Sequence, residues 1–207
     1  MKNDGVNKTN DMNLEGAEEY IKSRLGNELK ANLYYHGLHH TEDVVNAAMM
    51  LADAENISAN ERELLRTAAL FHDSGFLYTY KEHEVKSCDI ARENLPRFGY
   101  TPAQIEEICE IIKVTKIPQT PNDKLGEIMA DADLDYLGRD DYDIIANELY
   151  REFLGHGIVK NEEEWNRLQI KFFETHEYFT PTAKRLRYAT KMKHLEKLKE
   201  IVAGYGA

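Results

Sequence analysis

A histidine followed directly by an aspartate, His72-Asp73, stands at the end of the apolar stretch 68–71. The stretch reads Ala-Ala-Leu-Phe, which is typical of a buried helix, so the two polar side chains are expected where that helix ends. An imidazole and a carboxylate both suit a hard or borderline divalent metal, and at a helix end both can turn toward one ion. Such a pair is common by chance, so its meaning depends on partners elsewhere in the chain.

Two further stretches supply such partners, one upstream and one downstream. Residues 35–44 contain His40 and residues 129–135 contain Asp133, each beside an apolar helical face. If they converge with the His-Asp pair, the set suits Mn²⁺, Fe²⁺, Co²⁺, Ni²⁺ or Zn²⁺, with Mg²⁺ possible but less suited to nitrogen ligands. Four protein ligands on an octahedral ion leave room for water and a phosphoryl oxygen, which favours hydrolysis over redox chemistry. Taken singly, each residue could equally be a helix cap or a solvated side chain.

A His, a His-Asp and an Asp in this order, each in a helical setting, resemble the HD superfamily of metal-dependent phosphohydrolases. The resemblance covers about residues 35–138 and is specific as a set rather than piece by piece. It implies an all-α fold and hydrolysis of a phosphorylated substrate. It also implies four metal ligands, of which Asp73 additionally helps to deprotonate the attacking water: His40, His72, Asp73 and Asp133.

The first stretch is similar in more detail to the His-Asn-x-x-His-x-x-Asp-Val signature of cyclic-nucleotide phosphodiesterases, which belong to the same superfamily. Carried over, the signature makes His36 the general acid that protonates the leaving oxygen, and His40 a metal ligand. An acid role near neutral pH is natural for imidazole. The family's Asn is Gly37 here, so the surroundings of the metal differ. The alternative is that His36 merely packs beside Tyr35; His39 is expected to be structural.

Three more residues are candidates for the same site. His83 and Glu84 resemble a His-Glu pair of many HD proteins, which implies a catalytic role for His83 and a substrate contact for Glu84; a plain helix start is the alternative. Two-metal members generally use two histidines in this interval, and the chain has only His83 there, which favours one ion over two. Lys116 could meet a substrate phosphate, although a solvated helix-end lysine is the commoner role. Weaker candidates of that kind are Arg62, Arg66, Lys113 and Arg139.

The composition argues against several classes of binding partner and site. The net charge of -11 over 207 residues argues against binding a nucleic-acid polymer, which requires an excess of Lys and Arg, but leaves small phosphorylated substrates open. Cys88 and Cys109 are too few for a disulfide scaffold or a Cys-based zinc site, so we expect buried free thiols. The N-terminus is polar and no stretch is apolar enough for a bilayer, from which we expect a cytoplasmic protein without a membrane partner. The sequence leaves the oligomeric state open.

The elements that position these residues all read as helices. Apolar residues recur at three- and four-residue spacing, and strand-like alternation is not found. The expected helices cover about residues 14–29, 40–55, 58–72, 82–95, 101–112, 124–134, 140–153, 161–172 and 180–201. Side chains that cap helix starts are expected at Ser58, Thr101, Asp140, Asn161 and Thr180.

We therefore expect an all-α protein, an HD-domain helical bundle with a C-terminal helical extension, forming a single domain over residues 1–207. Residues 1–12 are polar and expected to be disordered, 35–138 hold the metal, and 140–203 form the extension. Aromatic residues of the extension could wall a base-binding pocket, but such a stripe is more often core, and core is favoured here. They are Trp165, Phe172, Phe173, His176, Tyr178 and Phe179.

Two functions from different classes follow. The first is an enzyme in which metal-activated water attacks a phosphate ester or anhydride, preferably of a nucleotide. The second is a metal- and nucleotide-binding regulatory module with little turnover. An intact ligand set and a candidate acid favour the enzyme, and an iron oxygenase is a distant third. The chain lacks the Gly-Tyr-Pro stretch of cyclic di-GMP phosphodiesterases and the Glu-Asp pair of alarmone hydrolases. The sequence does not decide between a phosphomonoesterase, a phosphodiesterase and a nucleotide pyrophosphatase.

Overall fold

A computed structural model describes residues 12–205, which form nine α-helices and three short 3-10 helices. These residues contain no β-strand, so the expected all-α fold is confirmed. The disorder expected for residues 1–12 concerns, apart from Met12, positions outside the described residues. None of the described helices has the length and apolar character needed to cross a membrane. In chain order the elements are α1 (Leu14–Glu28), α2 (Leu38–Glu55), α3 (Ala59–Phe71), η1 (Ser74–Leu77), α4 (His83–Asn94), η2 (Leu95–Phe98), α5 (Pro102–Lys113), α6 (Lys124–Asp133), η3 (Asp135–Gly138), α7 (Tyr142–Gly155), α8 (Glu162–Thr175) and α9 (Pro181–Gly204).

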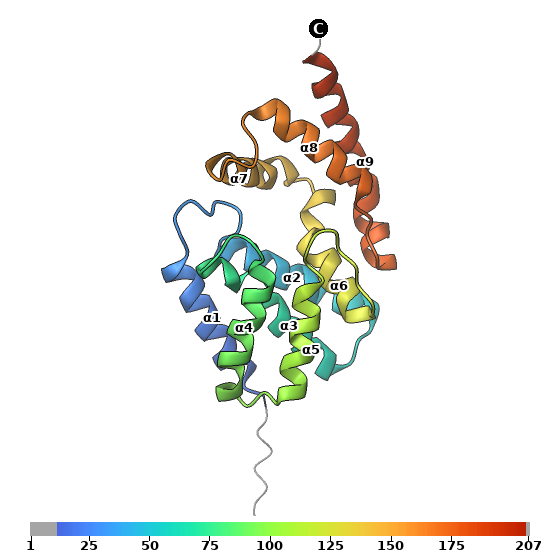
Figure 1. Ribbon diagram of the computed structural model, residues 1–207. Helices are drawn as coiled ribbons and strands as arrows, with labels where there is room; N and C mark the ends of the chain where they lie inside the picture. Colours follow the sequence, from blue (N-terminus) through green and yellow to red (C-terminus); the bar gives the residue numbers. More distant parts are fainter. Residues whose placement is uncertain (1–11, 206–207) are drawn as a thin grey trace, which may run out of the picture.

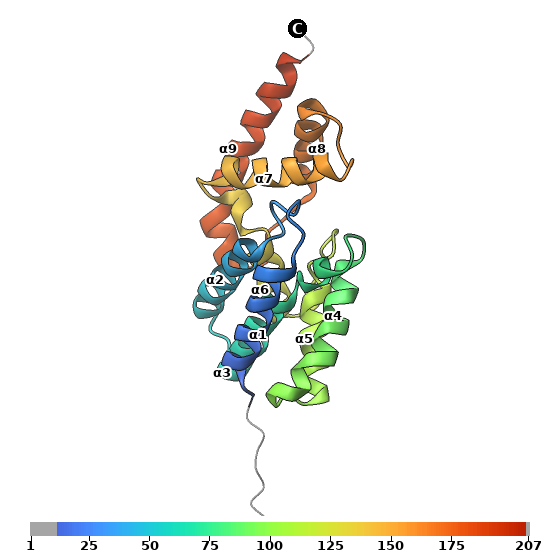
Figure 2. The ribbon, with the colours of Figure 1, turned by 90° about the vertical axis from the view of Figure 1, so that its left-hand side faces the viewer.

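The helices are arranged in two parts. Helices α1 to α6 form a bundle, and α7 to α9 lie at one end of it (Figure 1). Helix α9 starts near α2 and runs away from the bundle beside α8, as the turned view also shows (Figure 2). We call α1 to α6 the bundle and α7 to α9 the extension. The short helix η3 joins the two parts and packs against α9.

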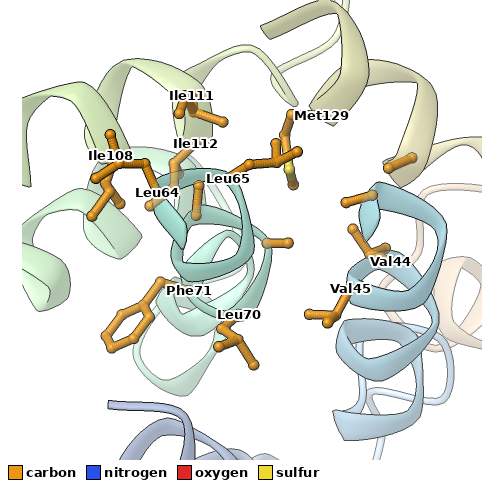
Figure 3. Close-up of a cluster of buried hydrophobic side chains, with 14 of the residues drawn as sticks. Val44, Val45, Leu64, Leu65, Leu70, Phe71, Ile108, Ile111, Ile112 and Met129 are labelled. Atoms are coloured by element: carbon orange, nitrogen blue, oxygen red, sulfur yellow. The ribbon is translucent and has the colours of Figure 1, made fainter. Parts of the chain in front are cut away.

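Helix α3 lies at the centre of the main core (Figure 3). Its apolar residues Leu64, Leu65, Leu70 and Phe71 are fully buried. Burial contributes roughly 1.5–3 kcal/mol for each large side chain, so the end of α3 is firmly held. Neighbouring helices supply the buried residues Val44, Val45, Ile108, Ile111, Ile112 and Met129, and the two cysteines are buried free thiols as expected.

Most of the predicted helix starts are confirmed, with two differences. The Asp140 cap is wrong, because α7 begins at Tyr142. Asp141 precedes that helix without a capping bond, since Arg139 binds its carboxylate. Helix α2 begins at Leu38, before the expected start, which places the first candidate ligand in the first turn. Side-chain caps form as predicted at Ser58, Thr101, Asn161 and Thr180.

The extension is tied to the end of α6 by two buried aspartates. The carboxylate of Asp131 accepts hydrogen bonds from the backbone N–H groups of Phe179 and Thr180, at 2.8 Å each, just before α9 begins. Asp135 accepts two hydrogen bonds from Arg187 of α9, at 2.7 and 3.0 Å. The acidic stretch 129–135 therefore has a second role, in fixing α9 against the bundle.

His176, between α8 and α9, is buried in an unusual way. Among the described residues neither of its ring nitrogens has a hydrogen-bond partner. Burial and the ammonium of Lys191, which donates to the backbone carbonyl of His176, lower the pKa of His176 to about 3. The ring is therefore neutral in the folded protein at neutral pH.

This burial predicts an acid sensitivity. A histidine in the unfolded chain has a pKa of about 6.5, whereas His176 stays neutral in the fold down to about pH 3, so below pH 6.5 the unfolded state binds the extra proton. Between pH 7 and pH 5 this should reduce the free energy of unfolding by about 2 kcal/mol. Urea unfolding of His176→Phe at both pH values should show that this part of the loss is removed, while the exposed control His39→Phe keeps it. Equal losses in wild type and His176→Phe would mean that His176 takes up a proton in the fold.

Candidate metal and catalytic site

Four side chains from the ends of three helices meet at one buried centre. The Nε2 atoms of His40 and His72 are 3.4 Å apart. Asp73 Oδ2 lies 3.3 Å from Nε2 of His72 and 3.5 Å from Nε2 of His40. Asp133 Oδ1 lies 3.3 Å from Nε2 of His40 and 3.5 Å from Nε2 of His72. The structure thus brings together the four residues that the sequence predicts as ligands, and His40, His72 and Asp133 form a possible metal site.

All four residues stand at helix ends. His40 lies in the first turn of α2, His72 and the residue after it follow α3, and Asp133 is the last residue of α6. Nδ1 of His72 is 2.8 Å from the backbone carbonyl oxygen of Ala69, so Nδ1 carries a hydrogen and Nε2 faces the centre. This carbonyl fixes the ring in the orientation that a metal-binding imidazole requires.

The donor atoms fit a divalent cation. Asp73 Oδ2 is buried and has no hydrogen-bond partner among the described residues, an arrangement that is costly for a carboxylate oxygen. Burial opposes charge on His72, but Asp73 and Asp133 outweigh it and raise the pKa of His72 well above its usual value. A cation would satisfy the orphaned oxygen and replace that proton. Ligand atoms that share an ion at bond lengths of about 2.1 Å lie roughly 3 to 3.5 Å apart, which matches the separations found here.

The segment after the His-Asp pair, which lies between the expected helices 58–72 and 82–95, forms the 3-10 helix η1 and brings α4 to the centre. The N–H of Gly75 donates to Ser87 Oγ at 2.8 Å, and the Ser87 hydroxyl donates to the carbonyl of His72 at 2.5 Å. A Cβ at residue 75 would lie 2.0 Å from the His83 carbonyl oxygen, so only glycine permits this approach. His83 Nε2 is consequently 3.3 Å from Asp73 Oδ1. Burial opposes protonation, but the bond to Asp73 raises the pKa of His83.

The predicted general acid, His36, lies beside this centre and contacts Glu152 of α7. Its Nδ1 is 2.5 Å from Glu152 Oε1, and its ring stacks on Phe76 with ring centroids 4.2 Å apart. The His36 side chain is 16% exposed, whereas Glu152 is fully buried. Sequence reasoning missed Glu152, because it lies in an ordinary helical pattern between Leu149 and Phe153 with no motif around it.

A cavity of about 490 Å³ adjoins the centre and extends between the bundle and the extension. The bundle contributes ionisable groups to its lining, namely His36, Asp73, Glu82, His83, Glu84, Lys116 and Asp133. The extension contributes mainly apolar groups, among them Leu149, Phe153, Trp165, Leu168, Phe172 and Phe173. Trp165 and Phe173 are also part of a second buried core cluster, so core and cavity wall are not exclusive roles. Tyr178 belongs to the main core instead.

The predicted cations differ in their relation to this cavity. Lys116 lines it and lies 3.8 Å from Glu82 Oε1, with both side chains largely exposed. The four weaker candidates do not line it; each is paired elsewhere, Arg62 with Asp53, Arg66 with Glu18, Lys113 with Glu110 and Arg139 with Asp43. His39, expected to be structural, is exposed and lies 3.3 Å from Glu148.

The chain is similar to known proteins in its bundle and in its whole fold. The family model of the HD domain matches residues 37–135. A "predicted HD superfamily hydrolase" from an uncultured Thermotogales bacterium is 19% identical, with 94% of each chain covered and a TM-score of 0.61. Bacillus subtilis YpgQ, whose structure was solved in complex with ADP, is 19% identical, with 95% of this chain and 100% of that chain covered and a TM-score of 0.64. Among the curated proteins none matches the sequence.

The four-ligand centre predicts how metal binding responds to substitution. Each of His72→Ala and Asp133→Ala removes one donor, and we expect each to weaken binding of Mn²⁺ by more than about 100-fold, since even outer partners of a metal site are worth about 10- to 100-fold. Calorimetric titration with Mn²⁺ and elemental analysis measure this, and circular dichroism checks that the helices persist. His39→Ala, next to a ligand but exposed, is the control and should bind normally. If His72→Ala and Asp133→Ala both contain as much metal as the wild type, the assignment of the metal site is wrong.

Proposed function

The chain is an HD-domain protein, and on this premise we propose that it is a metal-dependent phosphohydrolase acting on a phosphate ester or anhydride of a nucleotide. The observation that carries the proposal is the convergence of two imidazoles and two carboxylates beside a cavity that His36 and His83 also line. His40, His72, Asp73 and Asp133 would hold a divalent ion, which would supply an acidified water and neutralise charge on the phosphoryl group.

The chain's own residues then move protons and hold the substrate. Asp73 and His83, in contact at 3.3 Å, can take up the proton of the attacking water. His36 lines the same cavity and can give a proton to the leaving oxygen. Lys116 offers positive charge to a phosphate, and Glu84 can accept a hydrogen bond from a substrate hydroxyl. The number of ions, one rather than two, stays a prediction from the sequence.

Two observations support a nucleotide as the substrate. The structure of Bacillus subtilis YpgQ, which shares the fold, contains ADP. The cavity joins a polar lining from the bundle to aromatic walls such as Phe172, and flat bases stack well on aromatic side chains. A phosphate beside the metal donors and a base between the helices of the extension would use both linings.

Turnover is tested by phosphate and pyrophosphate release. We expect Mn²⁺- or Co²⁺-dependent hydrolysis within a panel of nucleoside mono-, di- and triphosphates, cyclic nucleotides and an activated aryl phosphate, and loss of this activity in His72→Ala. If no compound of the panel is hydrolysed although the protein is shown to bind metal, the hydrolase proposal is rejected and the regulatory module is favoured. Oxygen consumption by the iron-loaded protein would favour an oxygenase instead.

The acid role of His36 has its own test. His36→Ala should retain metal but slow turnover by about 100-fold for substrates with poor leaving groups, and much less for the activated aryl phosphate, whose leaving oxygen needs no proton. The comparison of kcat for the two substrate types measures this. Equal slowing of both would show that His36 is not the acid.

The aromatic wall predicts a binding effect. Phe172→Ala removes one ring from the cavity and should raise KM for nucleotides about 10-fold, because stacking of a base on an aromatic ring contributes about 1–3 kcal/mol. The kcat for the small aryl phosphate should change little. Tyr188→Ala, on the exposed surface of α9, is the control. An unchanged nucleotide KM in Phe172→Ala would place the base elsewhere.

A further inference from the structure

Glu152 is a fully buried carboxylate that reaches from α7 to the segment carrying His36. Its Oε2 accepts hydrogen bonds from the backbone N–H groups of Tyr35 and His36, at 3.0 and 3.1 Å. Its Oε1 accepts from the Tyr80 hydroxyl at 3.0 Å and contacts His36 Nδ1 at 2.5 Å. Both oxygens thus have two partners, and all of these partners belong to the bundle.

The charge of Glu152 decides which nitrogen of His36 carries hydrogen. Burial would raise the pKa of Glu152, but the hydrogen bonds from His36 and from the two backbone groups outweigh it and lower the pKa. Glu152 is therefore an ionised acceptor without a hydrogen to donate. His36 must supply the hydrogen of their short contact from Nδ1, which leaves Nε2 as the nitrogen available to a substrate.

We propose that Glu152 is the positioning residue of His36: it holds the ring through hydrogen on Nδ1, so that the protonated ring presents its Nε2–H to the leaving oxygen and the extension completes the active site. This inference rests on the proposed function. Glu152 lies in α7, beyond the part that the HD family model matches, residues 37–135. The stack on Phe76 restrains the ring further.

The same arrangement explains how Glu152 can act through His36 without touching a substrate. Glu152 does not line the cavity, whereas His36, Tyr80 and Tyr35 do. The two backbone hydrogen bonds fix the main chain at residues 35 and 36, and the side-chain bond fixes the ring. A carboxylate in this place also stabilises the imidazolium whose Nε2 proton is transferred in the reaction.

The variant Glu152→Gln tests the inference. Its amide oxygen can still accept from the two backbone N–H groups, but its NH₂ group can only donate to Nδ1, which moves the hydrogen of neutral His36 to Nε2. Nitrogen-15 NMR of the imidazoles should show His36 with hydrogen on Nδ1 in the wild type and on Nε2 in Glu152→Gln. For substrates with poor leaving groups kcat should fall about 100-fold, with KM, Mn²⁺ affinity and turnover of the activated aryl phosphate changed less than about threefold.

Two further variants separate positioning from simple support of the fold. Glu148→Gln, on the same helix and paired with His39, should keep wild-type activity. In the His36→Ala background, Glu152→Gln should cause almost no additional loss, because residues that act as a unit are not additive. A full additional loss in that background would show that Glu152 merely stabilises the fold and would overturn the inference.

The outcomes also separate this inference from the proposed function. A neutral wild-type His36 whose hydrogen is on Nε2 and not on Nδ1 overturns the inference, whether or not Glu152→Gln folds. Turnover with no selective loss in Glu152→Gln also overturns it and leaves the hydrolase standing. If no substrate is turned over but His36 carries hydrogen on Nδ1, the proposed hydrolase function is wrong, whereas the positioning of His36 by Glu152 is supported.

Discussion

Two carboxylates and two imidazoles share one buried centre. Burying these groups costs free energy, and much of the fold holds them close enough together to offset that cost. An ionised carboxylate without a partner is strongly unfavourable in a protein interior. Burial alone would raise the pKa of Asp133, but the bonds to His40 and His72 outweigh it and lower the pKa to about 2. Each of these charges is tolerable only because the others are near. The helix ends must therefore be unable to separate, and the burial of residues 67–71 at the end of α3 ensures this for His72 and Asp73.

The acidic stretch at the end of α6 connects this centre to the extension. Asp133 faces the imidazoles, whereas Asp131 and Asp135 on either side bind the residues just before α9 and its second turn. Gly138 permits this closeness, because a Cβ there would lie 2.4 Å from the backbone oxygen of Arg187. One short segment thus fixes the candidate metal ligand Asp133 and the extension relative to each other. The cavity between bundle and extension depends on that placement, since each part contributes one side of its lining.

Local chemistry could be predicted from the sequence, and distant pairing could not. The four candidate ligands are recognisable because metal chemistry restricts residue types and helix ends restrict their place, while caps such as Ser58 involve only neighbours. Glu152 lies 116 positions from His36, and no local pattern indicates such a partner. Asp140 was wrong as a cap because α7 begins at Tyr142, after Arg139 has bound the carboxylate of Asp141; the same guanidinium also binds Asp43, a distant partner that no local pattern indicates. The helical periodicity predicted that Phe173 is buried. It could not decide whether Phe173 belongs to the core or lines the cavity, because side chains of both kinds are buried.

The turn between α7 and α8 has a consequence for how proteins of this architecture can diverge. At Gly157 the backbone is left-handed, with φ +68, and an added Cβ would meet nothing within 4 Å; Ile158 beside it is 46% exposed. No ligand, acid or anchor of α9 lies in this turn. Insertions there would lengthen the connection between the two helices that wall the apolar side of the cavity without adding residues beside the four candidate metal ligands. Proteins of this fold could in this way accept larger or smaller molecules in the cavity while the four converging side chains stay in place.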